Sequence, residues 1–322
     1  MYYAVTHLTA FSYSETITDT VMQLRMQPRS DDLQTCVRFE LRISPKARAL
    51  SHRDYLGNTI HQFDIPARHR KLAVRAESVV ETKHAAPLPA GLGPDAWARV
   101  EAALDDRDLF DMILPSHFAR PSEMLAQFIA NRGIQRGPDP LRTLVALNRA
   151  LYSAFEYAPN VTKVDSPIEH ALEEGKGVCQ DFAHIMIALV RGMRIPCRYV
   201  SGYLYYRSHD RDRTSGDRDR SSDGATHAWV EAWLPDLGWV GFDPTNDLIC
   251  GDRHIRVAVG RDYDDVPPTR GVFTGEAESS LDVSVKVSSL PELPVDGVIH
   301  APEIALPQYD LLTYQQQQQQ QQ

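Results

Sequence analysis

The sequence lacks the features that mark membrane-spanning, secreted and metal-binding proteins. No apolar run approaches the roughly 20 residues that cross a bilayer, and the N-terminus has neither a basic n-region nor an apolar h-region. The 12 histidines form no H-E-x-x-H motif, and no C-x-x-C pair lies near them. We therefore expect a cytoplasmic protein with no membrane partner, no metal and no cofactor.

Cysteine and positive charge are both scarce. The four cysteines are too scattered for a disulfide framework or a metal signature, which fits a reducing compartment. Lysine and arginine number 34 against 43 aspartates and glutamates, which gives a formal net charge of −9. This balance argues against nucleic acid as a partner. The sequence leaves the oligomeric state open.

What the chain has is length and an ordinary soluble composition. Its 322 residues, 43% hydrophobic and 24% charged, suffice for one large or two ordinary domains. Residues 1–83 contain short alternating segments separated by turn signals such as Gly57-Asn58, which predicts a β-sandwich-like domain. It carries no chemical constellation, so we expect a packing or substrate-presenting module. The predicted strands span residues 2–13, 21–27, 36–43, 59–65 and 71–81.

Helical patterns follow a linker, residues 84–94, that is rich in proline and glycine. Ser166-Pro-Ile-Glu169 has the form of a capping box with proline at the first helical position, and Gly175 predicts the end of that helix. We assign residues 95–288 to a catalytic core with strands after it, and residues 289–322, proline-rich and then poly-Gln, to a disordered tail. The predicted helices of the first part span residues 95–104, 121–131, 140–157 and 166–174.

One cysteine stands at the head of a further helical pattern. From Cys179 to Met193 apolar side chains recur every three or four residues, which predicts a helix with one buried face that begins near Cys179. Free N–H groups and the positive end of the helix dipole at that terminus favour thiolate over thiol. The alternative is that Cys179 is a small hydrophobic residue in a core, as most free cysteines are.

Two aromatic and β-branched segments downstream supply partners for this cysteine. Residues 226–233 and 238–245 flank a turn and predict an antiparallel hairpin. His227, near the start of the first strand, and Asp243, at the end of the second, would then meet at one edge. Together with Cys179 they can act as nucleophile, base and orienting acid. Alternatively, His227 is a half-buried structural histidine and Asp243 forms a turn.

The strings GVCQDFAH, RYVSGYL, HAWVEAWLP and GWVGFDPTN contain these three residues and their surroundings. They resemble the core of the transglutaminase-like superfamily, in its bacterial branch of cysteine peptidases and amide-processing enzymes. HLTAFSYSE, LRMQPRS and DYLGNTIHQFDI are similar to the β domain that accompanies this core. The resemblance covers roughly residues 1–288. It implies an α+β fold with a papain-like transglutaminase core, and it matches Cys179, His227 and Asp243 to the family's nucleophile, base and orienting acid.

The implied chemistry is acyl transfer through a thioester, at carboxamide or peptide bonds of a peptide or protein substrate. Water as the second acceptor makes the protein a protease or amidase, which is the outcome we expect. A second amine as acceptor would make it a transglutaminase. A third reading is a peptide-binding module that retains the three residues without using them.

Three further expectations concern the surroundings of the cysteine. The backbone N–H of Cys179 is expected to stabilise the oxyanion, because it begins a helix. Tyr157 is a weaker oxyanion candidate, with packing at a helix end as the alternative, and His184 is expected to be structural. The charged segment 207–224 is either a lid over the site or a tolerated surface insertion.

Overall fold

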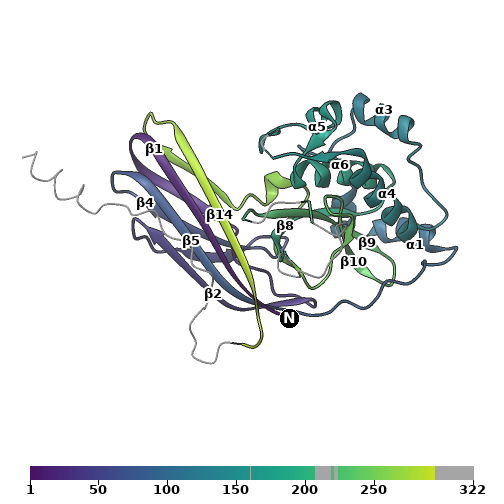
Figure 1. Cartoon of the computed structure of the whole chain (residues 1–322), viewed down its shortest axis with the longest axis horizontal. Helices are drawn as coiled ribbons and strands as arrows, with labels where there is room; N and C mark the ends of the chain where they lie inside the picture. Colours follow the sequence, from purple (N-terminus) through teal and green to yellow (C-terminus); the bar gives the residue numbers. More distant parts are fainter. Residues whose placement is uncertain (160, 207–218, 221–223, 294–322) are drawn as a thin grey trace, which may run out of the picture.

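The computed structural model describes residues 1–159, 161–206, 219–220 and 224–293. The chain forms a strand-rich β domain and a second part in which helices cover a sheet (Figure 1). Helices and antiparallel sheets together confirm the α+β class. Most of the charged segment 207–224, where a lid was hypothesised, lies outside the described residues, as do residues 294–322 of the tail that was expected to begin at residue 289.

The β domain is organised around one long strand, β1 (Tyr2–Leu24). Its first half pairs on one side with β5 (His69–Thr82) and on the other with β14 (Ser279–Leu290). Its second half pairs with β4 (Thr59–Ile65) and β13 (Thr269–Thr274). β1 therefore belongs to two layers, and apolar side chains from both layers share one core, as in a sandwich. The outer strands are β2 (Gln34–Ser44) and β3 (Leu50–Arg53).

Two features of this domain differ from the sequence-based expectation. The segments predicted at 2–13 and 21–27 form a single strand, whose pairing shifts register and whose Asp19 has a φ of 49°. Strands β13 and β14, which we had placed with the catalytic core up to residue 288, hydrogen-bond to β1 instead. Local alternation identifies a strand but not a partner more than 240 positions away in the chain.

The second part begins with helices. Side-chain caps begin some of them, as at α4 (Pro140–Ala154), where the Asp139 carboxylate accepts the N–H of Arg142 at 3.0 Å. The capping box expected at residue 166 is wrong, because the Ser166 hydroxyl accepts the N–H of Lys163 at 2.9 Å and the helix begins only after Pro167. Gly175, with a φ of 64°, ends that helix as expected. The helices are α1 (Ala96–Ala102), α2 (Arg107–Phe110), α3 (Glu123–Arg132), α4 (Pro140–Ala154), α5 (Ile168–Glu174) and α6 (Cys179–Gly192).

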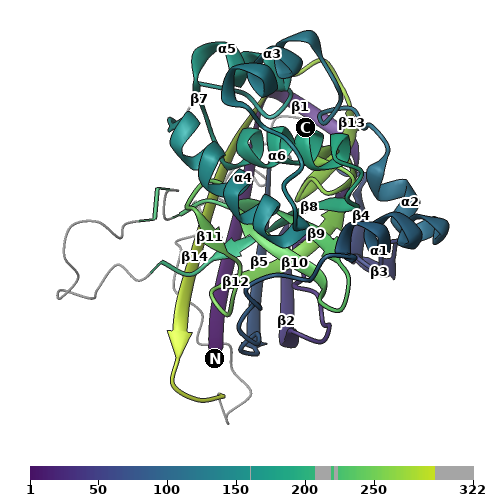
Figure 2. The ribbon, with the colours of Figure 1, turned by 90° about the vertical axis from the view of Figure 1, so that its right-hand side faces the viewer.

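A five-stranded antiparallel sheet lies between the helices and the β domain. Its strand order is β11-β10-β9-β8-β12, and α6 packs on β8 and β9 through the largest apolar core of the chain. Figure 2 shows α4 and α6 in front of this sheet and the strands of the β domain behind it. The strands are β8 (Cys197–Leu204), β9 (His227–Leu234), β10 (Gly238–Asp243), β11 (Leu248–Ile249) and β12 (His254–Gly260).

A smaller apolar cluster joins the two parts. Tyr203 and Ile255 of the second sheet pack against Tyr3, Val80 and Val285 of the β domain, all nearly inaccessible to solvent. Among the described residues no helix is both long enough and apolar enough to span a membrane. The expected cytoplasmic location stays a prediction.

Candidate active site

The nucleophile candidate, Cys179, is the first residue of α6, and a short network holds the turn before it. The buried carboxylate of Asp181 accepts the N–H of Val178 at 2.8 Å and the hydroxyl of Thr162 at 2.5 Å. Gly177 permits this, because a Cβ there would lie 2.8 Å from the Asp181 Oδ2. Asp181 thus fixes the loop that presents Cys179, a role beyond the dipole effect that its position suggested.

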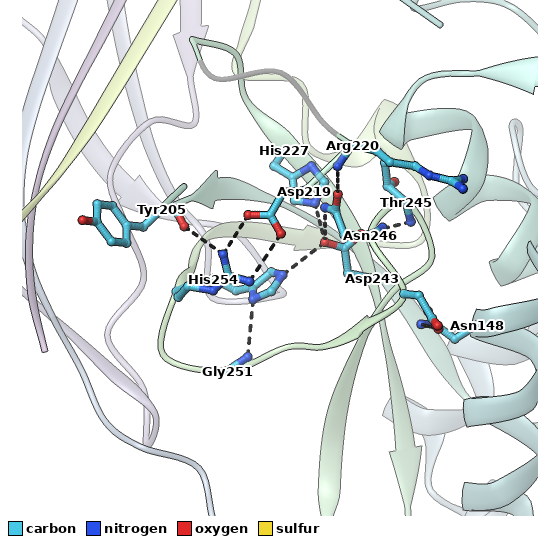
Figure 3. A network of polar contacts seen from close by, with 12 residues as sticks. Asn148, Tyr205, Asp219, Arg220, His227, Asp243, Thr245, Asn246, Gly251 and His254 are labelled. Carbon is cyan, nitrogen blue, oxygen red and sulfur yellow. Dashed lines mark hydrogen bonds and ion pairs between the residues drawn. The ribbon is translucent and has the colours of Figure 1, made fainter. Parts of the chain in front are cut away.

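The hairpin brings the other two predicted residues together. His227 begins β9, Asp243 ends β10, and the two strands pair in register, Phe242 opposite Val230. The His227 Nε2 donates to the Asp243 Oδ2 at 2.8 Å (Figure 3). The two side chains are only 2% and 0% exposed, so the interaction lies in a low-dielectric environment.

Asp243 accepts further hydrogen bonds that keep it charged. Its Oδ1 accepts the backbone N–H groups of Thr245 at 3.1 Å and Asn246 at 3.3 Å, and its Oδ2 accepts the Asn246 side-chain amide at 2.8 Å. Burial by itself would raise the pKa of Asp243, but the charge and hydrogen bond of His227, together with those of His254, hold it well below its usual range. The carboxylate is therefore ionised throughout the physiological pH range.

The electrostatics of His227 follow from this carboxylate. Burial would lower the pKa of His227, but the Asp243 carboxylate and hydrogen bonding with Cys179 raise it from 6.5 to about 10. Its Nδ1 is buried and has no hydrogen-bond partner among the described residues. One ring nitrogen thus binds the acid and the other is left for the thiol, which is the arrangement that a thiolate–imidazolium pair requires.

The structure adds a residue that the sequence reading missed, His254 at the start of β12. Its Nε2 lies 3.2 Å from the Asp243 Oδ2, and its side chain is nearly inaccessible to solvent. The alternating pattern of residues 254–260 signals a strand, but no local pattern shows that its first side chain reaches Asp243. His254 reaches Asp243 because β12 pairs with one edge of β8, while β9 of the hairpin pairs with the other edge.

The two imidazoles and the carboxylate also form a potential set of metal ligands. One possible ligand atom from each of His227, Asp243 and His254 lies within 4.8 Å of the other two. The shortest separation, 2.8 Å between His227 and Asp243, is a hydrogen-bond length. Two ligands of one tetrahedral zinc ion, at bond lengths of about 2.0–2.1 Å, lie about 3.3 Å apart. Hydrogen bonds therefore account for the cluster, and the expected lack of a metal stays a prediction.

The remaining sequence candidates lie close to the cysteine turn. Tyr157 is half-buried in a short parallel pairing with Gly177, so its segment runs beside the turn into Cys179. His184 is buried against Phe118 and accepts the N–H of Tyr263 at 3.2 Å. Burial lowers the pKa of His184 to about 3, which keeps it neutral. It is structural, as expected.

A cavity of about 540 Å³ opens next to this turn. Its lining includes Tyr157, Gly175 and Arg220. The Arg220 Nη1 donates to the carbonyls of Tyr152 and Phe155 at 2.6 and 3.2 Å. Its backbone N–H donates to the side chain of Asn246, which in turn binds Asp243. The three predicted catalytic residues do not themselves line the cavity, which reaches the turn before Cys179 only at Gly175.

Comparison with known proteins supports a common family. Residues 127–244 match the model of the transglutaminase-like superfamily, and residues 3–81 match that of the bacterial transglutaminase-like N-terminal region. An uncharacterized protein of Mycobacterium leprae is 36% identical over 287 residues, which are 89% of this chain and 98% of the relative. An uncharacterized protein of Mycobacterium tuberculosis is 33% identical over 314 residues, covering 93% and 95%.

Two further similarities are more distant. A protein-glutamine gamma-glutamyltransferase of Pseudomonas aeruginosa is 28% identical over 149 residues, 45% of this chain and 21% of that protein. Among solved structures, a protein of Cytophaga hutchinsonii described as a candidate cysteine protease aligns with a TM-score of 0.67 at 19% identity. That alignment covers 91% of this chain and 93% of the other, which shows a shared fold. With both regions matched and relatives aligned along nearly its whole length, the chain belongs to the transglutaminase-like superfamily, which is generally enzymatic.

Proposed function

We propose that the protein is a cysteine acyl-transfer enzyme that acts on carboxamide or peptide bonds of a peptide or protein, with water as the usual final acceptor. The observation that carries the proposal is the placement of His227. Its Nε2 is bound to a buried carboxylate, and its buried Nδ1 has no hydrogen-bond partner among the described residues, while interaction with Cys179 contributes to the raised pKa of the ring. This is the geometry of a base that exchanges a proton with a thiol while an acid fixes its tautomer.

The reaction begins with attack of the Cys179 sulfur on the substrate carbonyl carbon. The negative charge that develops on the oxygen is met by the backbone N–H of Cys179, which begins α6 and has no intrahelical acceptor. Protonated His227 gives its proton to the leaving nitrogen, the C–N bond breaks and an amine departs. Neutral His227 then takes a proton from water, whose oxygen attacks the thioester, and the C–S bond breaks to release the acid.

The cavity beside the turn is our candidate for the substrate cleft. Glu156, Tyr157 and Arg220 are among the residues that line it, and it is open to water. Water access favours hydrolysis of the thioester. Amine transfer is the second candidate, supported by the partial similarity to a protein-glutamine gamma-glutamyltransferase. Tyr157 remains a proposed additional hydroxyl donor.

Mass spectrometry of a glutamine-containing peptide separates these outcomes. Incubation without an added amine should convert the carboxamide to a carboxylate, and a primary amine in excess should give an amide adduct only if transfer competes. Cys179→Ala should abolish both products, whereas Cys197→Ala, at a buried cysteine of β8, should retain them. Full activity in Cys179→Ala would refute the proposal. Binding of peptide without any product would favour the peptide-binding module.

A further inference from the structure

Asp243 is approached by a second imidazole that no step of the proposed reaction uses. His254 reaches the same carboxylate oxygen as His227, from a different strand (Figure 3). The Gly251 N–H points at the His254 Nδ1 at 3.4 Å, which makes this nitrogen the acceptor. Burial lowers the pKa of His254, so the ring is neutral and its single proton lies on Nε2. His254 is therefore an N–H donor to Asp243.

The His254 ring is itself held in place. The Trp229 indole packs edge-on against it, with ring centroids 5.2 Å apart, and Trp229 is almost completely buried. The residue opposite His254 in the sheet is Leu204, so the backbone of His254 is part of the β8–β12 ladder. On the preceding residue, Arg253 donates to Asp219 at 2.8 Å. Because both its ring and its backbone are held in place, His254 can orient the Asp243 carboxylate that it contacts.

The β domain secures the strand that carries His254. β12 is the edge strand of its sheet, so its outer N–H and C=O groups lack a neighbouring strand. The side-chain amide of Gln34 accepts the N–H and donates to the C=O of Arg256, both at 2.8 Å. Asn58 makes the same pair of 2.8 Å bonds with Val259. Both amides are buried, and together they replace the missing strand.

We propose that His254 is a positioning residue that orients the Asp243 carboxylate toward His227, and that the β domain supports the active site by holding β12. The inference rests on the proposed function. It gives the β domain a role that needs no contact with substrate. Because His254 acts on His227 only through Asp243, its loss should slow the chemical step and leave substrate binding unchanged.

Two substitutions at His254 separate the hydrogen bond from the packing. His254→Phe keeps a ring against Trp229 but has no donor, whereas His254→Gln keeps an N–H near the position of Nε2. His7→Phe is the matched control, because His7 is a buried histidine of the β domain that bonds to the Tyr203 hydroxyl at 2.9 Å and does not touch Asp243. Two measurements apply to each purified full-length variant: kcat and KM for p-nitrophenyl acetate, and the rate of Cys179 alkylation by iodoacetamide at pH 6.

We expect His254→Phe to lower kcat and the alkylation rate by about tenfold, the loss of one hydrogen bond to a charged group, with KM unchanged. His254→Gln should stay within about threefold of the wild type, and His7→Phe should lower the melting temperature without changing either rate. Equal rates in His254→Phe and His7→Phe would refute the positioning role of His254 and would leave the proposed function standing. A wild-type Cys179 that reacts no faster than the buried cysteines would overturn the proposed function, and this inference with it.

Discussion

Replacement of Asp243 by asparagine removes one charge from the centre of the site and almost no volume. The Asp243 carboxylate is the main reason that the pKa of His227 rises from 6.5 to about 10, against a burial effect that lowers it. At about 1.4 kcal/mol per pKa unit, this rise favours the imidazolium by about 5 kcal/mol. Cys179 supplies part of the raising effect and burial opposes it, so the figure is the net of all three effects and not the share of Asp243 alone. In Asp243→Asn the imidazolium loses its counter-charge, and burial then favours the neutral ring.

We therefore expect Asp243→Asn to lower kcat at pH 7 by about a thousandfold, or about 4 kcal/mol, while the circular dichroism spectrum stays that of the wild type. The assay is p-nitrophenyl acetate turnover between pH 5 and 11, with Asp247→Asn as a control at an aspartate outside the pair. In the wild type, activity that depends on the imidazolium should decline as the pH rises through about 10. The activity of Asp243→Asn should show no decline near pH 10. A variant with the wild-type pH profile would refute the electrostatic role of Asp243.

Three other consequences follow from the same contacts. Gly177→Ala should lower both the melting temperature and Cys179 reactivity, because the added Cβ would lie 2.8 Å from the Asp181 carboxylate; an unchanged alkylation rate would contradict this. Gln34→Ala should reduce the free energy of unfolding in urea by about 1–3 kcal/mol, since the backbone N–H of Arg256 loses its acceptor, whereas Ala at the exposed Gln62 should have little effect. The raised pKa of His227 means that its ion pair contributes full stability below pH 6.5 and loses it as the pH rises through about 10. A melting temperature that increases with pH across this interval would contradict that assignment.

The parts of the site that the sequence could predict are those built by local pattern. The periodicity after residue 179 placed Cys179 at a helix start, and the two aromatic segments placed His227 and Asp243 at one edge of a hairpin. Both inferences depend on residues within about 20 positions of one another. Gly175 as a helix end belongs to the same class, because a left-handed conformation there needs no distant partner.

The features that the sequence could not predict depend on contacts between distant segments. His254 acts on Asp243 only because β12 pairs with β8 rather than with the hairpin. Strands β13 and β14 could not be assigned to the β domain, since their alternation fits any half-buried sheet. Ser166 shows a local failure, because its hydroxyl had a nearer competitor in the N–H of Lys163.

The most direct test of the central claim is selective alkylation of the native protein by iodoacetamide at pH 6, with peptide mapping. Burial raises the pKa of Cys36 and Cys197 to about 11 and also raises that of Cys250, so these three thiols should be inert. Cys179 should react fast, and His227→Ala should remove its advantage because the thiol then lacks the imidazolium. A Cys179 as slow as the other three, or one whose rate is unaffected by His227→Ala, would contradict the claim that these residues form an activated pair.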